Sequence, residues 1–402
     1  MPSKHKWQFA PKFRKNAFGW KSQPAIKRIK EAVSEIEKIN RKDAPLAADG
    51  AVLFFEKISP AIAHVDGSSG AIGGAVNSAI NKLVPIIAKA ETDENTRKKW
   101  LERLWKAIQD DEIPYIESIG DYWGDLCASK EIASFWADEL VEGVKLSCDT
   151  RFGYFAGTTL YLSALYKAER FDELLELLSS DRLKLWDYQQ FAVKAIADSG
   201  KPIEAVEYAQ KYRLQSYSDS AIALLCEEIL LKSGFEEEAY SQYAFEANRC
   251  TTNLATYRAI AKKYPRKNPE DILADLIDTT PGSEGKWFAT AKTLGYLDLA
   301  STLAKSSPCD PGTLTRAARD FQEKNPEFAT SCGLSAIHWL IEGYGYEATS
   351  WNLKEAFEYA ISAAEKIQAE KTVIDQIKQY SITINEHNQF ATVVKQLAES
   401  VS

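Results

Sequence analysis

Hydrophobic residues recur at helical spacing along this chain, and that periodicity restricts the fold more than any other feature. Pro24 suits the first turn of a helix, and after it Ile26, Ile29, Val33 and Ile36 fall on one stripe. The charged residues between them face away from that stripe. No run of alternating polar and apolar residues extends beyond a few positions. The sequence therefore predicts an all-α protein.

Cap and breaker residues predict where the next helices begin and end. A second helix is expected over 47–58, because Pro60 lacks a backbone N–H and interrupts the hydrogen-bond ladder. A long apolar run predicts a helix over 71–90. Asp93 is placed to cap a further helix over 95–109.

The second half of the chain contains a weak internal repeat. Four segments align on Arg170, Gly200, Gly234 and Gly295, which lie 30, 34 and 61 residues apart. The three glycines are each followed five residues later by an alanine: Ala205, Ala239 and Ala300. Glycine permits a tight turn between antiparallel helices, and a small residue lets the two helices approach closely. These spacings are near one or two units of about 34 residues.

At these residues the chain resembles tetratricopeptide-like (TPR-like) helical-hairpin repeats, over about residues 155–305. The resemblance implies a right-handed α-solenoid whose concave surface binds a protein or peptide partner. The full W-x2-L-G-x2-Y pattern of the family is absent, so the resemblance extends to the architecture and not to the family's ligands. The opening of the chain, from Trp7 to Trp20, also resembles uncharacterised bacterial proteins, which implies no activity.

The length of 402 residues allows two or three units, each large enough to bury a core. With 45% hydrophobic and 26% charged residues, the composition excludes wholesale disorder and a small disulfide scaffold. We expect an irregular TPR-like α-solenoid at residues 151–402. A helical N-terminal module at 23–150 and a basic aromatic arm at 1–22 precede it.

The charge of the chain is unevenly distributed. Residues 1–42 carry twelve Lys or Arg and three Glu, a net charge of +9, so the remainder carries −17 of the total of −8. Five large aromatic rings lie among the first of these cations, from Trp7 to Trp20. One hypothesis is that the arm docks on the acidic body and buries its rings.

The alternative hypothesis for the arm is binding to nucleic acid, because cations attract phosphates and aromatic faces stack on bases. A third is contact with a protein partner. The nucleic-acid alternative assigns the contacts to Lys4, Lys6, Trp7, Lys12, Phe13, Arg14, Lys15 and Trp20.

Candidate partner-binding residues lie in the second half of the chain. A basic patch at 258–267 ends a helix, where its cations complement the helix dipole or, together with two later arginines, bind an anionic ligand. The polar loop over 279–287 ends on a lysine and a tryptophan. The predicted partner-binding residues are Arg258, Lys262, Arg266, Lys286, Trp287, Arg316 and Arg319.

The densest group of acids contains Glu117, Asp121 and Asp125, which share one face if the segment is a continuous α-helix. Such a face could hold a divalent cation or supply an acid and a base, although a solvated face is the ordinary interpretation. The sequence contains no HExxH, no GxSxG and no phosphate-binding GK[ST] loop. It therefore predicts no catalytic residues, no metal and no cofactor.

The six cysteines form no CxxC pair and favour reduced thiols in a cytoplasmic protein. No uninterrupted apolar run reaches the length of a membrane span, and a membrane is not expected as a partner. We therefore expect a non-catalytic scaffold or adaptor that binds a protein or peptide within an intracellular assembly. The alternative is a nucleic-acid-binding protein that uses the arm and the 258–267 patch.

Overall fold

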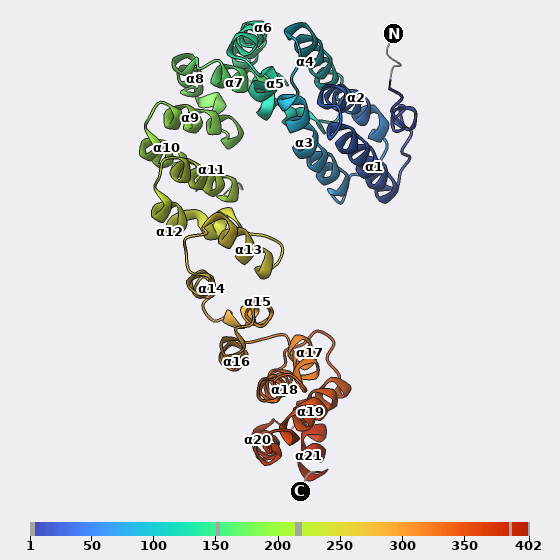
Figure 1. Cartoon of the computed structure of the whole chain (residues 1–402), viewed down its shortest axis with the longest axis vertical. Helices are drawn as coiled ribbons and strands as arrows, with labels where there is room; N and C mark the ends of the chain where they lie inside the picture. The colour runs from blue at the N-terminus through green and yellow to red at the C-terminus, as the bar shows by residue number, and fades with distance from the viewer. Residues whose placement is uncertain (1–4, 150–152, 214–218, 386–387, 401–402) are drawn as a thin grey trace. The chain divides into compact units, whose positions relative to one another are not determined.

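The computed structural model of this protein describes residues 5–149, 153–213, 219–385 and 388–400 (Figure 1). Within these ranges all regular structure is helical, which confirms the all-α prediction. The chain divides into two compact units, residues 1–235 (unit 1) and 236–402 (unit 2). The sequence predicted a domain boundary near residue 150. In the structure the helices on either side of that position, α6 (Lys130–Asp149) and α7 (Thr158–Lys167), contact each other within unit 1.

Unit 1 consists of α-helices joined by short turns and 3₁₀ segments. Its elements are η1 (Ala10–Lys12), α1 (Ser22–Asn40), α2 (Ala44–Ile62), α3 (Ala71–Lys89), α4 (Glu94–Gln109), η2 (Glu117–Tyr122), α5 (Trp123–Cys127), α6, α7, α8 (Phe171–Leu178), η3 (Asp181–Leu183), α9 (Trp186–Asp198), α10 (Pro202–Gln210) and α11 (Asp219–Lys232).

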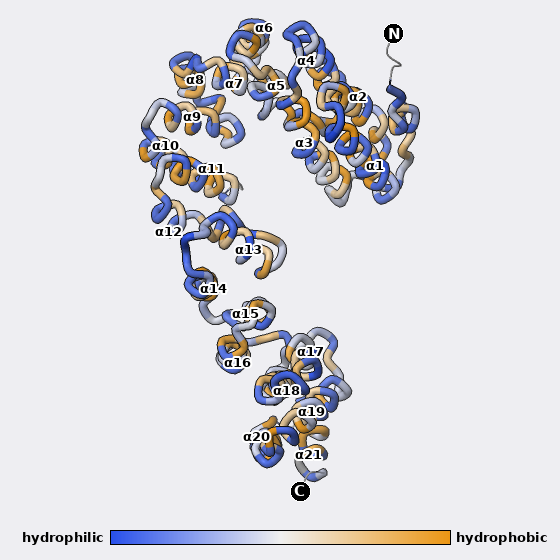
Figure 2. The backbone as a smooth tube through the Cα atoms, viewed as in Figure 1, coloured by the Kyte–Doolittle hydropathy of each residue, from blue (hydrophilic) through white to orange (hydrophobic). Residues whose placement is uncertain are grey.

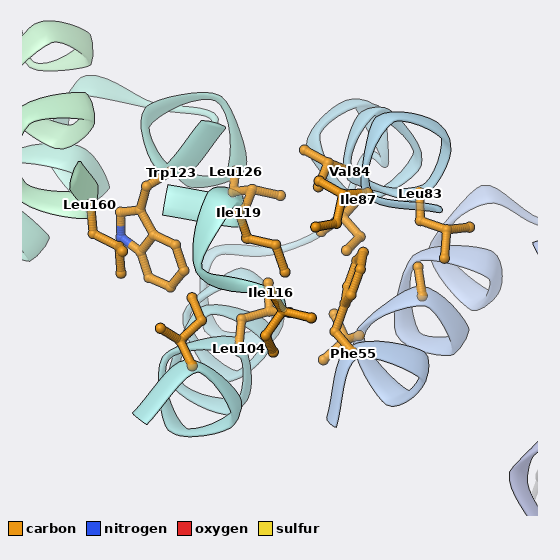
Figure 3. Packing of buried hydrophobic residues seen from close by; sticks show 14 of the residues in the cluster. Phe55, Leu83, Val84, Ile87, Leu104, Ile116, Ile119, Trp123, Leu126 and Leu160 are labelled. Atoms are coloured by element: carbon orange, nitrogen blue, oxygen red, sulfur yellow. The ribbon is translucent and has the colours of Figure 1, made fainter. Parts of the chain in front are cut away.

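The core of unit 1 lies where α2, α3, α4 and α5 meet. Figure 3 shows Phe55 of α2 facing Leu83 and Ile87 of α3, with Leu104 of α4 and Trp123 of α5 in the same layer. Burying side chains of this size stabilises a fold by about 1.5–3 kcal/mol each. Along these helices hydrophobic residues alternate with hydrophilic ones (Figure 2).

One described helix, α3, is long and apolar enough to cross a membrane by length and composition alone. A core helix passes the same test, and α3 contacts α1, α2 and α5. The apolar character of α3 is therefore accounted for by its place in the core of unit 1.

Pro60 does not end the second helix, contrary to the sequence-based prediction, because α2 continues to Ile62. Near this end, carbonyl groups of α2 accept hydrogen bonds from the N-terminal arm. Asn16 N–H donates to the carbonyl of Pro60 (2.8 Å), and Phe18 N–H donates to that of Ala61 (3.3 Å). The predicted helices after it are confirmed within a residue, and Asp93 caps α4 by accepting from Thr96 N–H at 3.0 Å.

Three helices of unit 1, α7, α9 and α11, end in the same turn geometry. Gly200 has φ +83° and its N–H donates to the carbonyl of Ala197, while the N–H of Lys201 donates to that of Ile196. These two bonds define a Schellman motif, which requires a left-handed residue after the helix. The same pair of bonds closes the turns at Glu169 and Gly234.

Glu169, with φ +58°, and not Arg170 is thus the counterpart of the turn glycines. The alignment that placed Arg170 there was wrong by one residue. In the turn at Glu169 a residue with a side chain adopts the left-handed conformation, which costs more free energy than it would for glycine.

Unit 2 is also a succession of helices, and Gly295, Gly343 and Gln368 close its own Schellman turns. A Cβ added to Gly333 would lie 2.6 Å from the side chain of Ala360. Because glycine has no Cβ, the two helices that carry these residues can pack closely. The elements are α12 (Glu236–Ala247), α13 (Asn253–Lys263), α14 (Pro269–Asp278), η4 (Glu284–Trp287), α15 (Phe288–Leu294), α16 (Leu297–Ser306), α17 (Pro311–Phe321), α18 (Pro326–Ile341), α19 (Ser350–Glu365), α20 (Glu370–Thr383) and α21 (Ala391–Ser400).

Candidate functional site

A small cleft in unit 2 contains two of the residues that the sequence singled out. It has a volume of about 180 Å³ and lies between α17, the loop after α18 and the start of α19. Arg316 and Arg319 contribute one side of it from successive turns of α17, and Tyr346 contributes from the loop. The remaining lining residues are Asp310, Pro311, Gly312, Thr315, Leu340, Gly345, Ala348, Asn352, Glu355 and Tyr359.

The two arginines are only partly engaged by their neighbours. Arg316 Nη2 donates to Thr313 Oγ1 at 2.9 Å and lies 3.8 Å from Asp310 Oδ2. Arg319 Nε donates to Asp320 Oδ1 at 2.9 Å, and this bond raises the pKa of Arg319. A guanidinium has five N–H donors in a planar fork, so each arginine retains donors for an anionic group.

Tyr346 lines this cleft, two further exposed aromatic residues, Tyr344 and Trp351, are next in sequence to the lining residues Gly345 and Asn352, and the sequence analysis did not single out any of the three. Tyr346 is 93% exposed, Trp351 at the start of α19 is 68% exposed and Tyr344 is 45% exposed. The loop that carries the tyrosines turns at Gly343 and Gly345, with φ of +88° and +107°. Two tyrosines, each directly after a glycine of a polar loop, were the available sequence signal, since such a loop has no core in which to bury them.

The other predicted partner-binding residues do not line the cleft. Arg258 and Lys262 are exposed on α13, and Arg266 follows that helix with Nη1 3.5 Å from Glu236 Oε2. Lys286 is exposed, whereas Trp287 is buried and its Nε1 donates to Thr280 Oγ1 at 3.1 Å. The tryptophan at the end of the 279–287 loop is therefore part of the packing of unit 2.

The N-terminal arm docks on unit 1, which confirms the first hypothesis for its rings. Trp7, Phe9, Phe13 and Phe18 are buried, and Phe13 packs against Phe54 of α2 with ring centroids 5.5 Å apart. Trp7 and Phe13 therefore cannot offer their faces to bases, as the nucleic-acid hypothesis required. Among the aromatic residues named in the nucleic-acid hypothesis, Trp20 is 71% exposed. Among the cations named in it, Lys6, Lys12, Arg14 and Lys15 are exposed, and Lys4 lies outside the described residues.

Hydrogen bonds fasten the backbone of the arm to α1 as well as to α2. The N–H groups of Gln8 and Phe9 donate to the carboxylate of Glu35, at 2.8 and 3.2 Å. Arg28 donates to the carbonyl of Ala17 at 2.8 Å, and its guanidinium lies over the ring of Phe18. The arm is thus an integral part of unit 1.

A second cleft, of about 740 Å³, lies between the arm and α1. Five cationic side chains and two carboxylates contribute to its lining. The cations are Lys12, Lys27, Arg28, Lys30 and Lys38, and the acids are Glu31 and Glu35.

A third cleft, of about 710 Å³, lies between α2 and α4, and its strongest charges already have partners. Arg103 forms a bidentate pair with Glu56 at 2.8 and 2.7 Å and a further bond to Asp49 at 2.6 Å. These bonds raise the pKa of Arg103. The guanidinium therefore stabilises the packing of α4 on α2.

The acidic residues expected to share a helix face do not lie on one α-helix. Glu117 and Asp121 belong to the 3₁₀ segment η2, whereas Asp125 lies on α5 and is exposed. Burial raises the pKa of Asp121 to about 6, and Lys194 of α9 opposes that shift. Among the described residues, no group of three or more His, Cys, Asp or Glu side chains is placed to hold a metal ion.

No family model matches the chain, and neither a search of curated proteins nor one of solved structures found a similar protein.

Proposed function

We propose that this protein is a non-catalytic scaffold that binds a protein or peptide partner through the cleft of unit 2. The observation that carries the proposal is the grouping of Arg316 and Arg319 with the exposed ring of Tyr346 in one cleft. Tyrosine, tryptophan and arginine are the residues that most often dominate the binding energy of protein interfaces.

The size of the cleft indicates what it accommodates. A volume of about 180 Å³ suits one or two side chains rather than a substrate or cofactor, for which pockets of about 300–1,000 Å³ are usual. A carboxylate placed between the arginines would take up their remaining donors, and an apolar neighbour would cover Tyr346. The proposed ligand is therefore a peptide segment that combines acidic and apolar residues.

The shared turns support the finer proposal of a TPR-like α-solenoid. Schellman turns recur at Glu169, Gly200 and Gly234 in unit 1 and at Gly295 in unit 2. Consecutive hairpins with the same turn stack in one direction when each packs on the next, and such stacks present extended binding surfaces.

The cysteines support the proposal of an intracellular location. Among the described residues none of the six forms a disulfide, and Cys127, Cys226, Cys309 and Cys332 are buried. Burial raises the pKa of Cys127 to about 12, which keeps the thiol protonated and unreactive. Cysteines kept as thiols outside disulfides are usual in reducing compartments.

A displayed library of random peptides, selected against the immobilised full-length protein, tests the proposed function. Selected peptides are expected to contain acidic and aromatic or aliphatic residues. Their affinity for the Arg316→Glu, Arg319→Glu variant should fall at least tenfold in fluorescence anisotropy. The control is Lys305→Glu, Lys371→Glu, which reverses two exposed charges of unit 2 outside the cleft. Enrichment of no peptide, or equal loss in both variants, would contradict the proposal.

A further inference from the structure

The cleft between the arm and α1 carries cations that the fold does not use. Lys12, Lys27, Lys30 and Lys38 are exposed, and within the described part of the chain none of them forms an ion pair. Of the two acids in the lining, Glu35 already accepts two backbone N–H groups of the arm. The cleft therefore presents an uncompensated positive charge on a rigid support.

The lysines of α1 form a line along the helix. Lys27, Lys30 and Lys38 line the same cleft, and at 1.5 Å per residue they cover about 16 Å of the helix axis. Phosphates follow one another every 3.4 Å of axis along one strand of a duplex, and at somewhat greater intervals in an extended strand. The line of lysines is long enough to face several consecutive phosphates.

The chemistry of the exposed groups favours nucleic acid over a protein as the occupant. Protein interfaces gain their energy from aromatic and arginine anchors and are depleted in lysine. Here the rings of Phe9 and Phe13 are buried, and Arg28 is held by Ala17 and Phe18. What remains exposed is lysine, which binds phosphates as a point charge without requiring a fixed geometry.

One exposed ring precedes, by three positions in the sequence, the lining residue Gln23. Trp20 comes two residues before the start of α1, and its carbonyl accepts from the N–H of Asp66, which holds the backbone while the indole is exposed. A base stacked on an exposed aromatic ring contributes about 1–3 kcal/mol, and only an unpaired base can reach one. Trp20 therefore favours a single strand over a duplex.

We propose that the cleft between the arm and α1 binds the backbone of a single-stranded nucleic acid, with Lys12, Lys27, Lys30 and Lys38 on its phosphates and Trp20 on a base. This surface is separate from the cleft in unit 2, and either proposal can fail without the other. The buried rings of the arm serve to position the lysines and do not touch the strand.

Anisotropy titration of the full-length protein with a labelled 20-nucleotide single-stranded DNA and its RNA counterpart tests this proposal. Four phosphate contacts predict a slope of about −2.8 for the logarithm of affinity against that of salt concentration. Affinity should then fall about 50-fold between 50 and 200 mM salt. Weaker binding of the matching duplex is expected.

Variants locate the surface. Lys27→Glu, Lys30→Glu, Lys38→Glu should weaken binding at 50 mM salt at least about tenfold and flatten the salt slope. Trp20→Ala should weaken single-strand binding about fivefold or more and leave duplex binding unchanged. The control reverses three other exposed lysines of unit 1, Lys99, Lys145 and Lys201, and so changes the net charge equally.

Three outcomes would overturn the proposal. One is no binding at 50 mM salt by a protein with a native circular dichroism spectrum. Another is equal weakening by the control variant, which would assign the effect to net charge. The third is equal competition by poly-glutamate at the same charge concentration, which would indicate an acidic protein partner instead of a nucleic acid.

Discussion

Arg97 is the clearest case of a single residue that holds several helices. It is buried and, within the described ranges, forms no ion pair with a carboxylate; its guanidinium donates to the carbonyls of Ile87 (2.6 Å), Ala90 and, more weakly, Leu126. The first two close the C-terminal end of α3, where partial negative charge accumulates. Burial lowers the pKa of Arg97, but an arginine stays protonated at any physiological pH.

Replacing Arg97 with methionine keeps much of the volume and removes every donor. The Arg97→Met variant leaves buried carbonyls without partners, and we expect the free energy of unfolding to fall by about 2–4 kcal/mol. Urea unfolding followed by circular dichroism measures this loss. The exposed Lys99→Met change should stay within about 0.5 kcal/mol of the wild type. A similar stability for both variants would show that the carbonyls of α3 find other donors.

Asp121 makes the stability of unit 1 depend on pH. Its pKa of about 6 in the folded state lies above the ordinary 3.8, so the folded state binds this proton more tightly than the unfolded state. Protonation therefore stabilises the fold, and ionisation between pH 4 and 7 destabilises it. Asp187 and Glu117 add to the raised pKa, whereas Lys194 lowers it.

The Asp121→Asn variant keeps the shape of the side chain without the charge. At pH 7.5 it should be more stable than the wild type by about 1–3 kcal/mol, and the difference should vanish near pH 4. Urea unfolding at both pH values measures it. The matched control is Asp125→Asn, which removes an exposed carboxylate four residues away. A gap of the same size at pH 4 and pH 7.5 would contradict the raised pKa of Asp121.

Among the elements, the docked arm depends on one close approach. A Cβ added to Gly50 of α2 would lie 2.1 Å from Cζ2 of Trp7, so the indole rests directly on the helix backbone. Gly50→Ala should therefore destabilise the protein by about 1–3 kcal/mol and speed trypsin cleavage of the arm at Lys12 to Lys15. Urea unfolding and limited proteolysis measure the two effects.

The contact between Gly50 and Trp7 can be isolated with two further variants. In a Trp7→Ala background, Gly50→Ala should stabilise by about 0.5–1 kcal/mol, the ordinary preference of a helix interior for alanine. Gly74→Ala on α3, where an added Cβ meets no atom within 4 Å, should show the same gain in the wild type. If Gly50→Ala is equally damaging with and without Trp7, the arm does not rest on Gly50.

The elements that the sequence predicted correctly are those governed by nearby residues. The cap of α4 by Asp93 depends on a residue three positions away, and it could be predicted from sequence. The hydrogen bonds that the arm makes to the last carbonyls of α2 could not be predicted, because Asn16 lies more than forty positions before Pro60 in the chain. The turn at Glu169 escaped prediction because glycine was the only available signal for a left-handed residue.

The residues of the candidate site show the same contrast between features set by nearby residues and features set by distant ones. Arg316 and Arg319 were identified because charge and helical spacing are visible in sequence, and the structure places both at one cleft. Trp287 resembled a binding residue in its polar loop, but its indole is buried beside Thr280. Sequence reveals the chemistry of a side chain, whereas its exposure is decided by contacts between elements distant along the chain.

At the scale of the whole molecule, apolar burial is unevenly distributed along the helices. Within unit 2, α13 buries three residues, among them one aliphatic side chain, Ile260. By contrast α18 buries ten, including Phe328, Ile337 and Leu340. In a stack of hairpins each element is stabilised by its neighbours, so local stability should follow this difference.

Hydrogen exchange of the full-length protein, followed by mass spectrometry, tests that expectation. Amides in α13 should exchange at least about tenfold faster than those in α18, because α13 opens with the loss of little apolar burial. A globular unit that unfolds in one cooperative step would instead protect both helices equally. Matched rates in α13 and α18 would therefore argue against a solenoid, and graded rates along α12 to α19 would support one.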